Sequence, residues 1–170
     1  VRQGPCDEEN RRKAIDRVDE LIHRIYRQVE MNGEQCAIAR TPDDLPRLKA
    51  EGKKAFYIGI ENGYGIGKDL KNITRFHDAG ITYITLCHTR NNDICDSSSD
   101  TTAHWNGLSP FGRKVVREMN RQGIMIDLSH AAESTFWDVL KYSKAPVIAS
   151  HSSASAIYKH DRNLTDKQLR

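Results

Sequence analysis

The sequence predicts an α/β fold in which parallel strands alternate with helices. Apolar runs of strand length begin near residues 36, 55, 81, 124 and 146, and a helical pattern separates each run from the next. The runs are apolar on both faces, which is typical of parallel strands that are covered by helices. About five such units in 170 residues fall short of a complete eight-stranded barrel, which takes about 250 residues. They fit either an open doubly wound sheet or the middle of a barrel.

Residues 8–32 are predicted to form one long amphipathic helix. Its apolar residues recur at the i, i+3, i+4, i+7 spacing of a single helix face: Ile15, Val18, Leu21, Ile22, Ile25 and Val29. This helix makes 1–35 a leading helical region, and the βα units that carry the candidate site follow over 36–170. No low-complexity tract divides the chain, so we treat residues 1–170 as a single domain segment.

Local signals mark the ends of the later helices. Thr41–Asp44 predicts a helix start in which the threonine caps and the proline takes the first helical position. Ser109–Pro110 predicts another start, and Gly80 and Gly123 each end a helix just before a strand. The predicted helices after the first start at 41, cover about 69–78, run from 109 to 123 and cover about 133–143, and the predicted strands cover 36–39, 55–60, 81–88, 124–129 and 146–151.

The composition argues against nucleic acid or a membrane surface as the main partner. The formal net charge is only +3, and Lys and Arg are scattered rather than clustered. No apolar run approaches the roughly 20 residues that span a bilayer, and the four cysteines include no CxxC pair that would indicate a thiolate zinc site. The chain begins with Val1 rather than Met, so we interpret it as a segment of a longer chain. We predict no localisation: cell envelope, periplasm and cytoplasm all stay open.

A carboxylate or an imidazole follows four consecutive predicted strands, namely Glu61, His88, His130 and His151. In βα folds the carboxyl ends of the strands hold the functional site. Imidazole and carboxylate together are the ligand set of zinc. One such histidine is more often a structural residue than a ligand, but four polar residues in register favour a shared metal site. The remaining histidines are expected on the surface, with His160 left open: His23, His77, His104 and His160.

Three stretches of the chain resemble the renal (membrane) dipeptidase family of zinc peptidases. They read YIGIENGYGIGKDLKNITRFHDAGITYITLCHTRNND, NGLSPFGRKVVREMNRQGIMIDLSHAAESTFWDVL and APVIASHSSASAIYKHDRNLTDKQLR. The resemblance covers roughly residues 36–170, and its DLSH, SHSSA and RN-L-D elements are together quite specific. Members of the family are (β/α)8 barrels that hydrolyse dipeptides with two zinc ions. The resemblance therefore implies the central sector of a TIM-type barrel, with about five of its eight strands.

The resemblance also implies a role for each candidate site residue. The family's metal-bridging glutamate matches Glu61, and the two histidines that complete one metal match His130 and His151. The histidine that faces the substrate matches His88, which we expect to donate to the developing oxyanion. The arginine that holds the substrate carboxylate matches Arg162, whose planar guanidinium fits a free carboxylate.

Two departures from the family pattern matter. Family members commonly read Glu-Gly-Gly at the bridging position, where this chain has Glu61-Asn62-Gly63. The family's His-x-Asp pair, which serves the other metal, does not precede residue 36, and the late-strand aspartate that handles the proton is not present either. The sequence thus carries three of the five expected protein ligands. We expect the segment alone to be inactive and to occur as a homo-oligomer or with companion segments that complete the barrel.

The leading hypothesis is metal-dependent hydrolysis of the peptide bond of dipeptides, by a zinc-activated hydroxide, as part of a longer chain. Zinc lowers the pKa of a bound water to about 7, so hydroxide is available at neutral pH. Two alternatives remain open. One is a barrel metallohydrolase that acts on another amide, such as an N-acyl amino acid, and the other is a non-catalytic relative that binds a ligand or partner.

Overall fold

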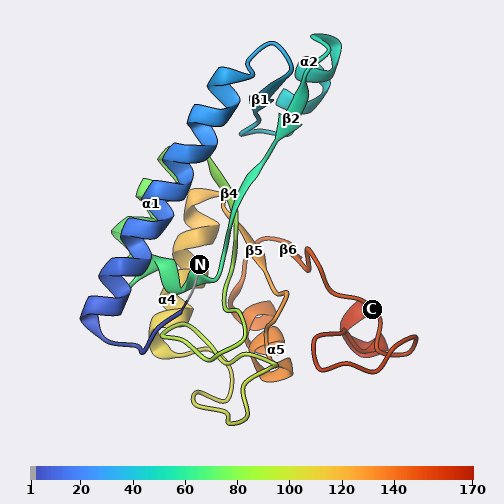
Figure 1. Ribbon diagram of the computed structural model, residues 1–170. Helices are drawn as coiled ribbons and strands as arrows, with labels where there is room; N and C mark the ends of the chain where they lie inside the picture. Colours follow the sequence, from blue (N-terminus) through green and yellow to red (C-terminus); the bar gives the residue numbers. More distant parts are fainter. Residues whose placement is uncertain (1–2) are drawn as a thin grey trace.

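The computed structural model describes residues 3–170, so the first two residues of the predicted leading region lie outside it. The chain alternates between helices and strands throughout, as Figure 1 shows. In chain order the elements are α1 (Glu8–Met31), β1 (Cys36–Ile38), α2 (Asp44–Ala50), β2 (Lys54–Phe56), β3 (Ile58–Glu61), the 3-10 helix η1 (Gly63–Ile66), α3 (Lys71–Asp78), β4 (Ile81–Thr85), α4 (Pro110–Gln122), β5 (Met125–Asp127), α5 (Glu133–Tyr142), β6 (Val147–Ile148) and α6 (Asp166–Leu169).

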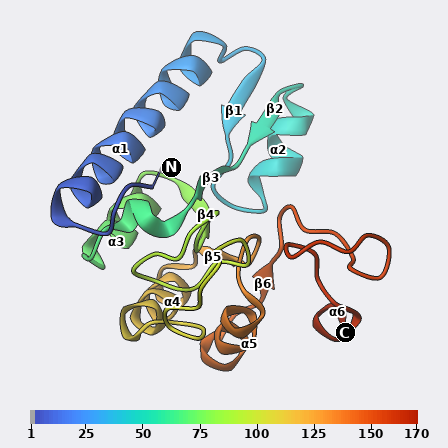
Figure 2. The same ribbon diagram turned by 60° about the horizontal axis from the view of Figure 1, so that its bottom comes forward.

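Four strands form one parallel sheet in the order β3-β4-β5-β6. Its register aligns Glu61 with Thr85, Thr85 with Asp127 and Asp127 with Ile148, so the carboxyl ends of all four strands lie at one edge. The helices α3, α4 and α5 follow one another in an arc along this sheet (Figure 2). The predictions of parallel strands and of helices between them are confirmed.

The prediction of five strands in one sector needs a correction, because β1 lies outside the four-stranded sheet. It pairs in parallel with β2 instead, and this two-stranded sheet lies with α2 at one end of the molecule (Figure 1). The single strand predicted over 55–60 is interrupted at Tyr57, so β2 pairs with β1 while β3 pairs with β4. The chain thus passes from one sheet to the other within a few residues.

Gly59 lies just after the point where the strand changes partner, and it packs closely against the neighbouring strand. The register of β3 against β4 shifts between Ile58 and Gly59, and the ring of Tyr83 lies directly over the Gly59 backbone. A Cβ atom at Gly59 would come within 2.1 Å of that ring. Only glycine leaves room for the tyrosine, and this packing accompanies the irregular pairing.

The helix-start and helix-stop predictions have different outcomes. Ser109 caps α4 by accepting a hydrogen bond from the Gly112 N–H at 2.8 Å, and Gly123, with φ of 78°, ends it, as predicted. The predicted threonine cap of α2 is wrong. The helix begins at Asp44, whose carboxylate accepts hydrogen bonds from the backbone N–H groups of Arg40 and Thr41, both at 2.9 Å. The aspartate closes this turn in place of the threonine hydroxyl.

The core lies between the sheet and the helices. Its fully buried members come from both layers and include Ile84 and Ile126 of the sheet and Phe76, Val115 and Met119 of the helices. Burying each such side chain stabilises the fold by roughly 1.5–3 kcal/mol relative to exposure. Among the helices of residues 3–170, none is both long enough and apolar enough to cross a membrane.

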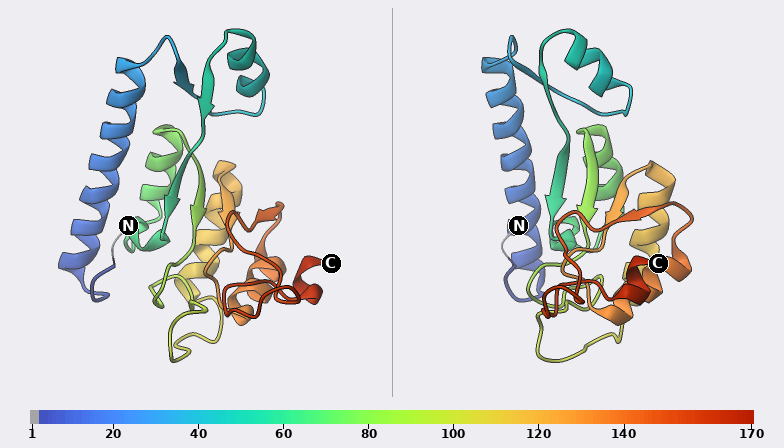
Figure 3. Two further views of the ribbon diagram at one scale, coloured as in Figure 1. Left: turned by 45° about the vertical axis from the view of Figure 1, so that its right-hand side comes forward. Right: turned by 90° about the vertical axis from the view of Figure 1, so that its right-hand side faces the viewer.

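The long polar stretch 89–108 is an ordered loop beyond the strand ends. The Asp96 carboxylate accepts hydrogen bonds from the N–H groups of His104 at 2.9 Å, Trp105 at 3.0 Å and Gly107 at 3.2 Å, which folds the loop back on itself. This loop and the segment 152–170 lie toward the same end of the molecule (Figure 3). The carboxyl ends of the strands therefore face the loop 89–108 and the segment 152–170.

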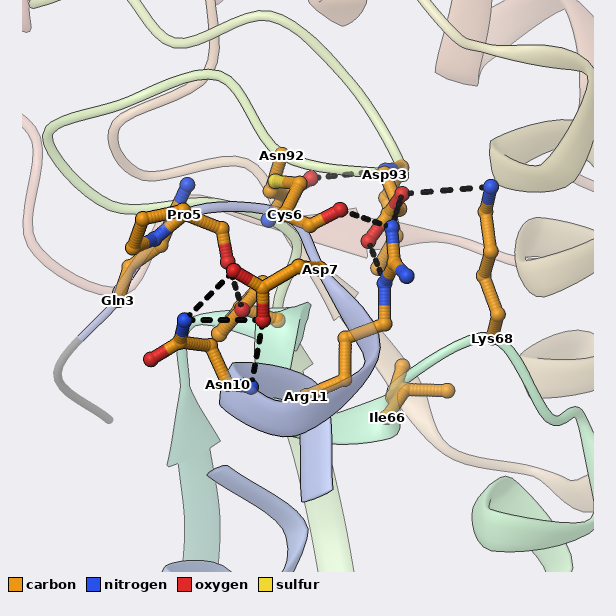
Figure 4. A network of polar contacts seen from close by, with 12 residues as sticks. Gln3, Pro5, Cys6, Asp7, Asn10, Arg11, Ile66, Lys68, Asn92 and Asp93 are labelled. Carbon is orange, nitrogen blue, oxygen red and sulfur yellow. Dashed lines mark hydrogen bonds and ion pairs between the residues drawn. The ribbon is translucent and has the colours of Figure 1, made fainter. Parts of the chain in front are cut away.

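The amino-terminal region is joined to this loop by a partly buried ion pair. Arg11 of α1 binds the Asp93 carboxylate through two nitrogens, with Nε–Oδ2 at 2.7 Å and Nη2–Oδ1 at 2.8 Å (Figure 4). Lys68 approaches the same carboxylate at 3.6 Å, and the Gln3 side chain donates to the Asn91 carbonyl at 2.7 Å. These contacts hold the start of α1 against the loop that follows β4.

Candidate metal centre

The three predicted metal ligands converge at the carboxyl end of the sheet. Glu61 Oε1 lies 3.4 Å from His130 Nε2 and 3.2 Å from His151 Nε2, and the two Nε2 atoms are 3.0 Å apart. A tetrahedral zinc ion with ligands at about 2.0–2.1 Å places ligand atoms roughly 3.3 Å from each other. The spacing and the chemistry of these three donors therefore fit one zinc ion. Within residues 3–170, no other three His, Cys, Asp or Glu side chains gather in this way.

The strands place these residues differently from the sequence prediction in one respect. Glu61, predicted to follow its strand, is the last residue of β3. The three histidines do not end their strands, because β4 ends at Thr85, β5 at Asp127 and β6 at Ile148. Each histidine instead lies three residues beyond its strand, at the start of the following loop. The equal offset brings their rings to one level above the sheet.

His130 is held in an unusual backbone conformation. Its φ is 70°, in the left-handed region that is costly for a residue with a Cβ atom. Its carbonyl accepts the Ser98 N–H at 2.9 Å, and the next N–H, of Ala131, donates to the Leu128 carbonyl at 3.1 Å. The side chain is only 2% exposed. The fold thus sustains a strained turn that directs this imidazole at Glu61.

The environment of His130 keeps its ring neutral. Burial lowers the pKa of His130 to about 4, and the nearby charges of Arg162, His88 and His151 lower it further against the opposing effect of Glu61. At neutral pH the ring therefore has a free lone pair. A neutral imidazole is the form that binds a metal.

His88 lies beside this cluster. Its Nε2 is 3.7 Å from Glu61 Oε1, and its ring centroid is 4.1 Å from that of His130. The side chain is 41% exposed, so it borders the open side of the cluster. This is the position of a residue that can meet a bound molecule.

Arg162 lies on the segment after β6 and reaches back to the cluster. Its Nη2 donates to the His151 carbonyl at 3.4 Å. Its Nε is buried, and among the described residues it has no hydrogen-bond partner. The side chain lines a cavity of about 1020 Å3 between the loops, together with Ser98, whose buried hydroxyl also lacks a partner in the described part of the chain. A buried polar atom without a partner is uncommon in a folded protein and calls for an explanation, and these two lie in residues that border the cavity.

The other histidines lie away from the cluster. His23, His77, His104 and His160 are all exposed. His160, which the sequence left open, accepts the Arg162 N–H through its Nδ1 at 3.2 Å.

The asparagine that departs from the family pattern occupies a position that favours glycine. Asn62 has a φ of 82°, and among residues with a Cβ asparagine tolerates such values best. Its side-chain oxygen accepts hydrogen bonds from the Tyr64 N–H at 3.1 Å and from Asn92 Nδ2 at 3.2 Å. The residue next to Glu61 is therefore fixed by contacts that glycine could not make.

Sequence reasoning missed a polar network beneath the histidines. Asp127 is fully buried and accepts hydrogen bonds from Thr85, Ser129 and Ser150. Burial acts to raise the pKa of Asp127, but the hydrogen bonds outweigh burial and hold the pKa below its usual range. The available signal was the charged residue in IMIDLSH, since an acid inside an apolar strand needs buried partners.

The comparisons with known proteins agree on one family. Residues 4–170 match the sequence model of Membrane dipeptidase (Peptidase family M19). The dipeptidase tcpJ of Claviceps purpurea (strain 20.1) is 40% identical over 158 residues, which are 93% of this chain and 36% of that protein.

Solved structures give the same result. The probable dipeptidase PvdM from Pseudomonas aeruginosa superposes with a TM-score of 0.86 and 30% identity, over 91% of this chain and 41% of that one. A metallo peptidase from Rhodobacter sphaeroides, liganded with a phosphinate mimic of the dipeptide L-Ala-D-Ala, has a TM-score of 0.77 and 32% identity, over 86% of this chain and 43% of that one. The chain spans about two fifths of the length of these relatives. It belongs to the membrane dipeptidase family.

Proposed function

We propose that this chain supplies the glutamate–histidine half of a zinc centre that hydrolyses dipeptides in the full-length protein. The observation that carries the proposal is the mutual approach, within 3.0–3.4 Å, of Glu61 Oε1 and the Nε2 atoms of His130 and His151. Membership of a dipeptidase family supports the reaction class. When bound, zinc would supply activation of a water molecule and polarisation of the scissile carbonyl.

The residues around the zinc position have separate roles in this proposal. His130 and His151 would each offer one ring nitrogen to the metal, and Glu61 would offer two carboxylate oxygens and a negative charge. His88, on the open side of the cluster, would donate a hydrogen bond to the carbonyl oxygen of the substrate as charge develops on it.

Arg162 would bind the free carboxylate of the substrate. Its side chain borders the cavity between the loops, and a planar guanidinium matches a carboxylate with two parallel hydrogen bonds. The phosphinate dipeptide mimic held by the Rhodobacter sphaeroides relative supports a dipeptide as the substrate class. A carboxylate anchor within reach of the scissile bond would favour short peptides over long ones.

Comparing three substrates in the full-length protein tests the reaction. The substrates are a dipeptide, the same dipeptide amidated at its C-terminus, and an N-acyl amino acid. We expect zinc-dependent hydrolysis of the dipeptide above all. Arg162→Lys should lower kcat/KM for the free dipeptide far more than for the amide, because a lysine cannot make the paired contact. Equal losses on both would remove Arg162 from the carboxylate role.

The same assay separates the alternatives. Faster turnover of the N-acyl amino acid than of any dipeptide would favour the other amidohydrolase activity. Stoichiometric binding of a dipeptide without turnover would favour a binding protein. Neither result is expected from a centre with this donor set and this family membership.

We also propose that the 170-residue segment is not active by itself. The His-x-Asp pair and the late aspartate that the family resemblance implies are not among its residues. General acid–base catalysis alone is typically worth about 10²–10⁴ in rate. A homo-oligomer or companion segments would be needed to complete the barrel. Zinc-supplemented segment and full-length protein should therefore differ by orders of magnitude in turnover, and comparable rates would refute this proposal.

A further inference from the structure

A buried carboxylate lies directly beneath His151. Asp127, which is 0% exposed, uses one oxygen, Oδ1, to accept the backbone N–H groups of Ser129 at 3.0 Å and Ser150 at 2.9 Å. Its other oxygen, Oδ2, accepts the hydroxyl groups of Thr85 at 2.7 Å and Ser150 at 2.6 Å. Every contact to this carboxylate comes from a donor, so its oxygens act only as acceptors.

This arrangement fixes the direction of the Ser150 hydroxyl. A serine hydroxyl has one proton, and the short contact to Asp127 Oδ2 uses it. The same oxygen lies 2.7 Å from His151 Nδ1 and can therefore only accept there. Ser129 Oγ, at 3.4 Å, is too distant to compete for the Ser150 proton. The hydrogen on the neutral His151 ring must then sit on Nδ1.

The hydrogen on Nδ1 determines the state of the other ring nitrogen of His151. With its hydrogen on Nδ1, His151 presents a bare lone pair at Nε2, the atom that lies 3.2 Å from Glu61 Oε1 and 3.0 Å from His130 Nε2. Which ring nitrogen binds a metal is set by the hydrogen bond that the other one makes. The buried acid thus acts on the cluster through a serine.

His130 is not controlled in this way. Its Nδ1 is buried and, within residues 3–170, has no hydrogen-bond partner. Burial, the strained turn and the stacking with His88 hold its ring instead. The relay, by which we mean the hydrogen-bond chain Asp127–Ser150–His151, therefore acts on His151 and not on His130. His151 is the more exposed of the two rings, with 41% exposure against 2%.

We propose that Asp127 and Ser150 are positioning residues that hold His151 in its Nδ1–H tautomer and direct Nε2 at the Glu61–His130 pair. The inference deepens the proposed zinc site and rests on it for its purpose. The proton arrangement itself is a property of the protein without metal, so it can be measured separately.

Asp127→Asn is the most informative variant because it should reverse the direction of the hydrogen bonds between residue 127, Ser150 and His151. The amide oxygen must take the Oδ1 position, where two backbone N–H groups donate, so the NH2 group takes the Oδ2 position and donates to Ser150. The serine proton then turns to His151 Nδ1, and the ring hydrogen moves to Nε2. Ser150→Ala should leave the two tautomers mixed, and Ser150→Thr, which keeps a hydroxyl at an exposed position, should restore the original one.

The primary measurement is ring nitrogen NMR of His151 in the metal-free, full-length protein at a pH where the ring is neutral. We expect a protonated Nδ1 in the wild type, a protonated Nε2 in Asp127→Asn and a mixture in Ser150→Ala. The second measurement is zinc affinity by competition with a chelator, which should fall about 10- to 100-fold in Ser150→Ala and further in Asp127→Asn.

Thr85→Val is the matched control, since it removes the other hydroxyl from the same oxygen without touching His151. It should keep the Nδ1–H tautomer and a zinc affinity within about threefold of the wild type. An equal loss in Thr85→Val and Ser150→Ala, or a wild-type ring protonated on Nε2, would overturn the inference. A wild type with the expected tautomer but no zinc binding would instead refute the proposed zinc site and leave the relay standing. If Asp127→Asn does not fold, the Ser150→Ala and Ser150→Thr pair still decides.

Discussion

Glu61 ends β3 and His151 follows β6, with two strands between them in the sheet, yet Glu61 Oε1 lies 3.2 Å from His151 Nε2. On a flat sheet, three strand spacings of about 4.8 Å would put these positions roughly 14 Å apart. A sheet that curves, so that its carboxyl edge turns inward, accounts for this contact. Such curvature is that of a barrel, and with the family membership it confirms the predicted sector of a TIM-type barrel over the open doubly wound sheet.

The close packing of Gly59 against Tyr83 gives the first prediction. Gly59→Ala should lower the free energy of unfolding by about 1–3 kcal/mol, because its Cβ would overlap the tyrosine ring in a packed sheet. Urea denaturation measures the loss. The double variant Gly59→Ala/Tyr83→Leu should regain much of it, whereas additive losses would show that the ring is not the obstacle.

The Arg11–Asp93 pair gives the second prediction. Its side chains are only 18% and 9% exposed. Two guanidinium nitrogens bind the two carboxylate oxygens, and such bidentate pairs are among the stronger hydrogen-bonded ion pairs. Arg11→Met should lower the free energy of unfolding by about 2–3 kcal/mol, less than for a fully buried pair because Arg11 is partly exposed and Lys68 stays near the acid. Limited proteolysis should also cut the 89–108 loop faster.

The exposed pair Arg17–Glu20 is the matched control for this prediction. It lies on the same helix, with side chains 46% and 54% exposed. Arg17→Met should change the free energy of unfolding by less than about 0.5 kcal/mol. Similar effects from the two arginine variants would contradict a special role for the pair with Asp93.

The depressed pKa of His130 gives a pH prediction for the metal-free protein. Between about pH 4 and pH 6.5 the unfolded chain protonates this histidine while the folded chain does not. The unfolded state then binds more protons than the folded state. The contribution of His130 to the free energy of unfolding is therefore fully present above this window and is lost as the pH falls through it. We expect a contribution on the order of 2 kcal/mol, measured by urea denaturation across the window. His130→Asn should flatten this part of the profile, and an unchanged slope would assign it to other groups.

The sequence predicted the meeting of Glu61, His130 and His151 because each follows a buried apolar run. Parallel strands put their carboxyl ends at one edge whatever their exact lengths. The prediction therefore survived an error in the strand ends, which lie three residues before each histidine. The roles of these residues, and those of His88 and Arg162, stay predictions that the variants above can test.

Other features depend on register and could not be derived from the sequence alone. Thr85, Asp127 and Ser150 meet only because the alignment of β4, β5 and β6 puts them side by side. The register shift between Ile58 and Gly59 likewise accompanies the close packing of the Tyr83 ring, a contact between segments distant in the sequence. Periodicity identifies the elements, but it does not determine which residues of neighbouring strands face each other.

The backbone of His130 gives the last prediction. With φ at 70°, any residue with a Cβ is strained here by roughly 1–2 kcal/mol, while glycine is not. His130→Ala and His130→Gly both remove the imidazole and leave nearly the same space, so they differ chiefly in the backbone. In the metal-free protein, His130→Gly should be more stable than His130→Ala by about 1 kcal/mol in urea denaturation, although glycine usually destabilises a folded chain. A more stable alanine variant would show that the turn relaxes once the ring is gone, so that the contacts of the imidazole, rather than the surrounding fold, sustain the strained conformation.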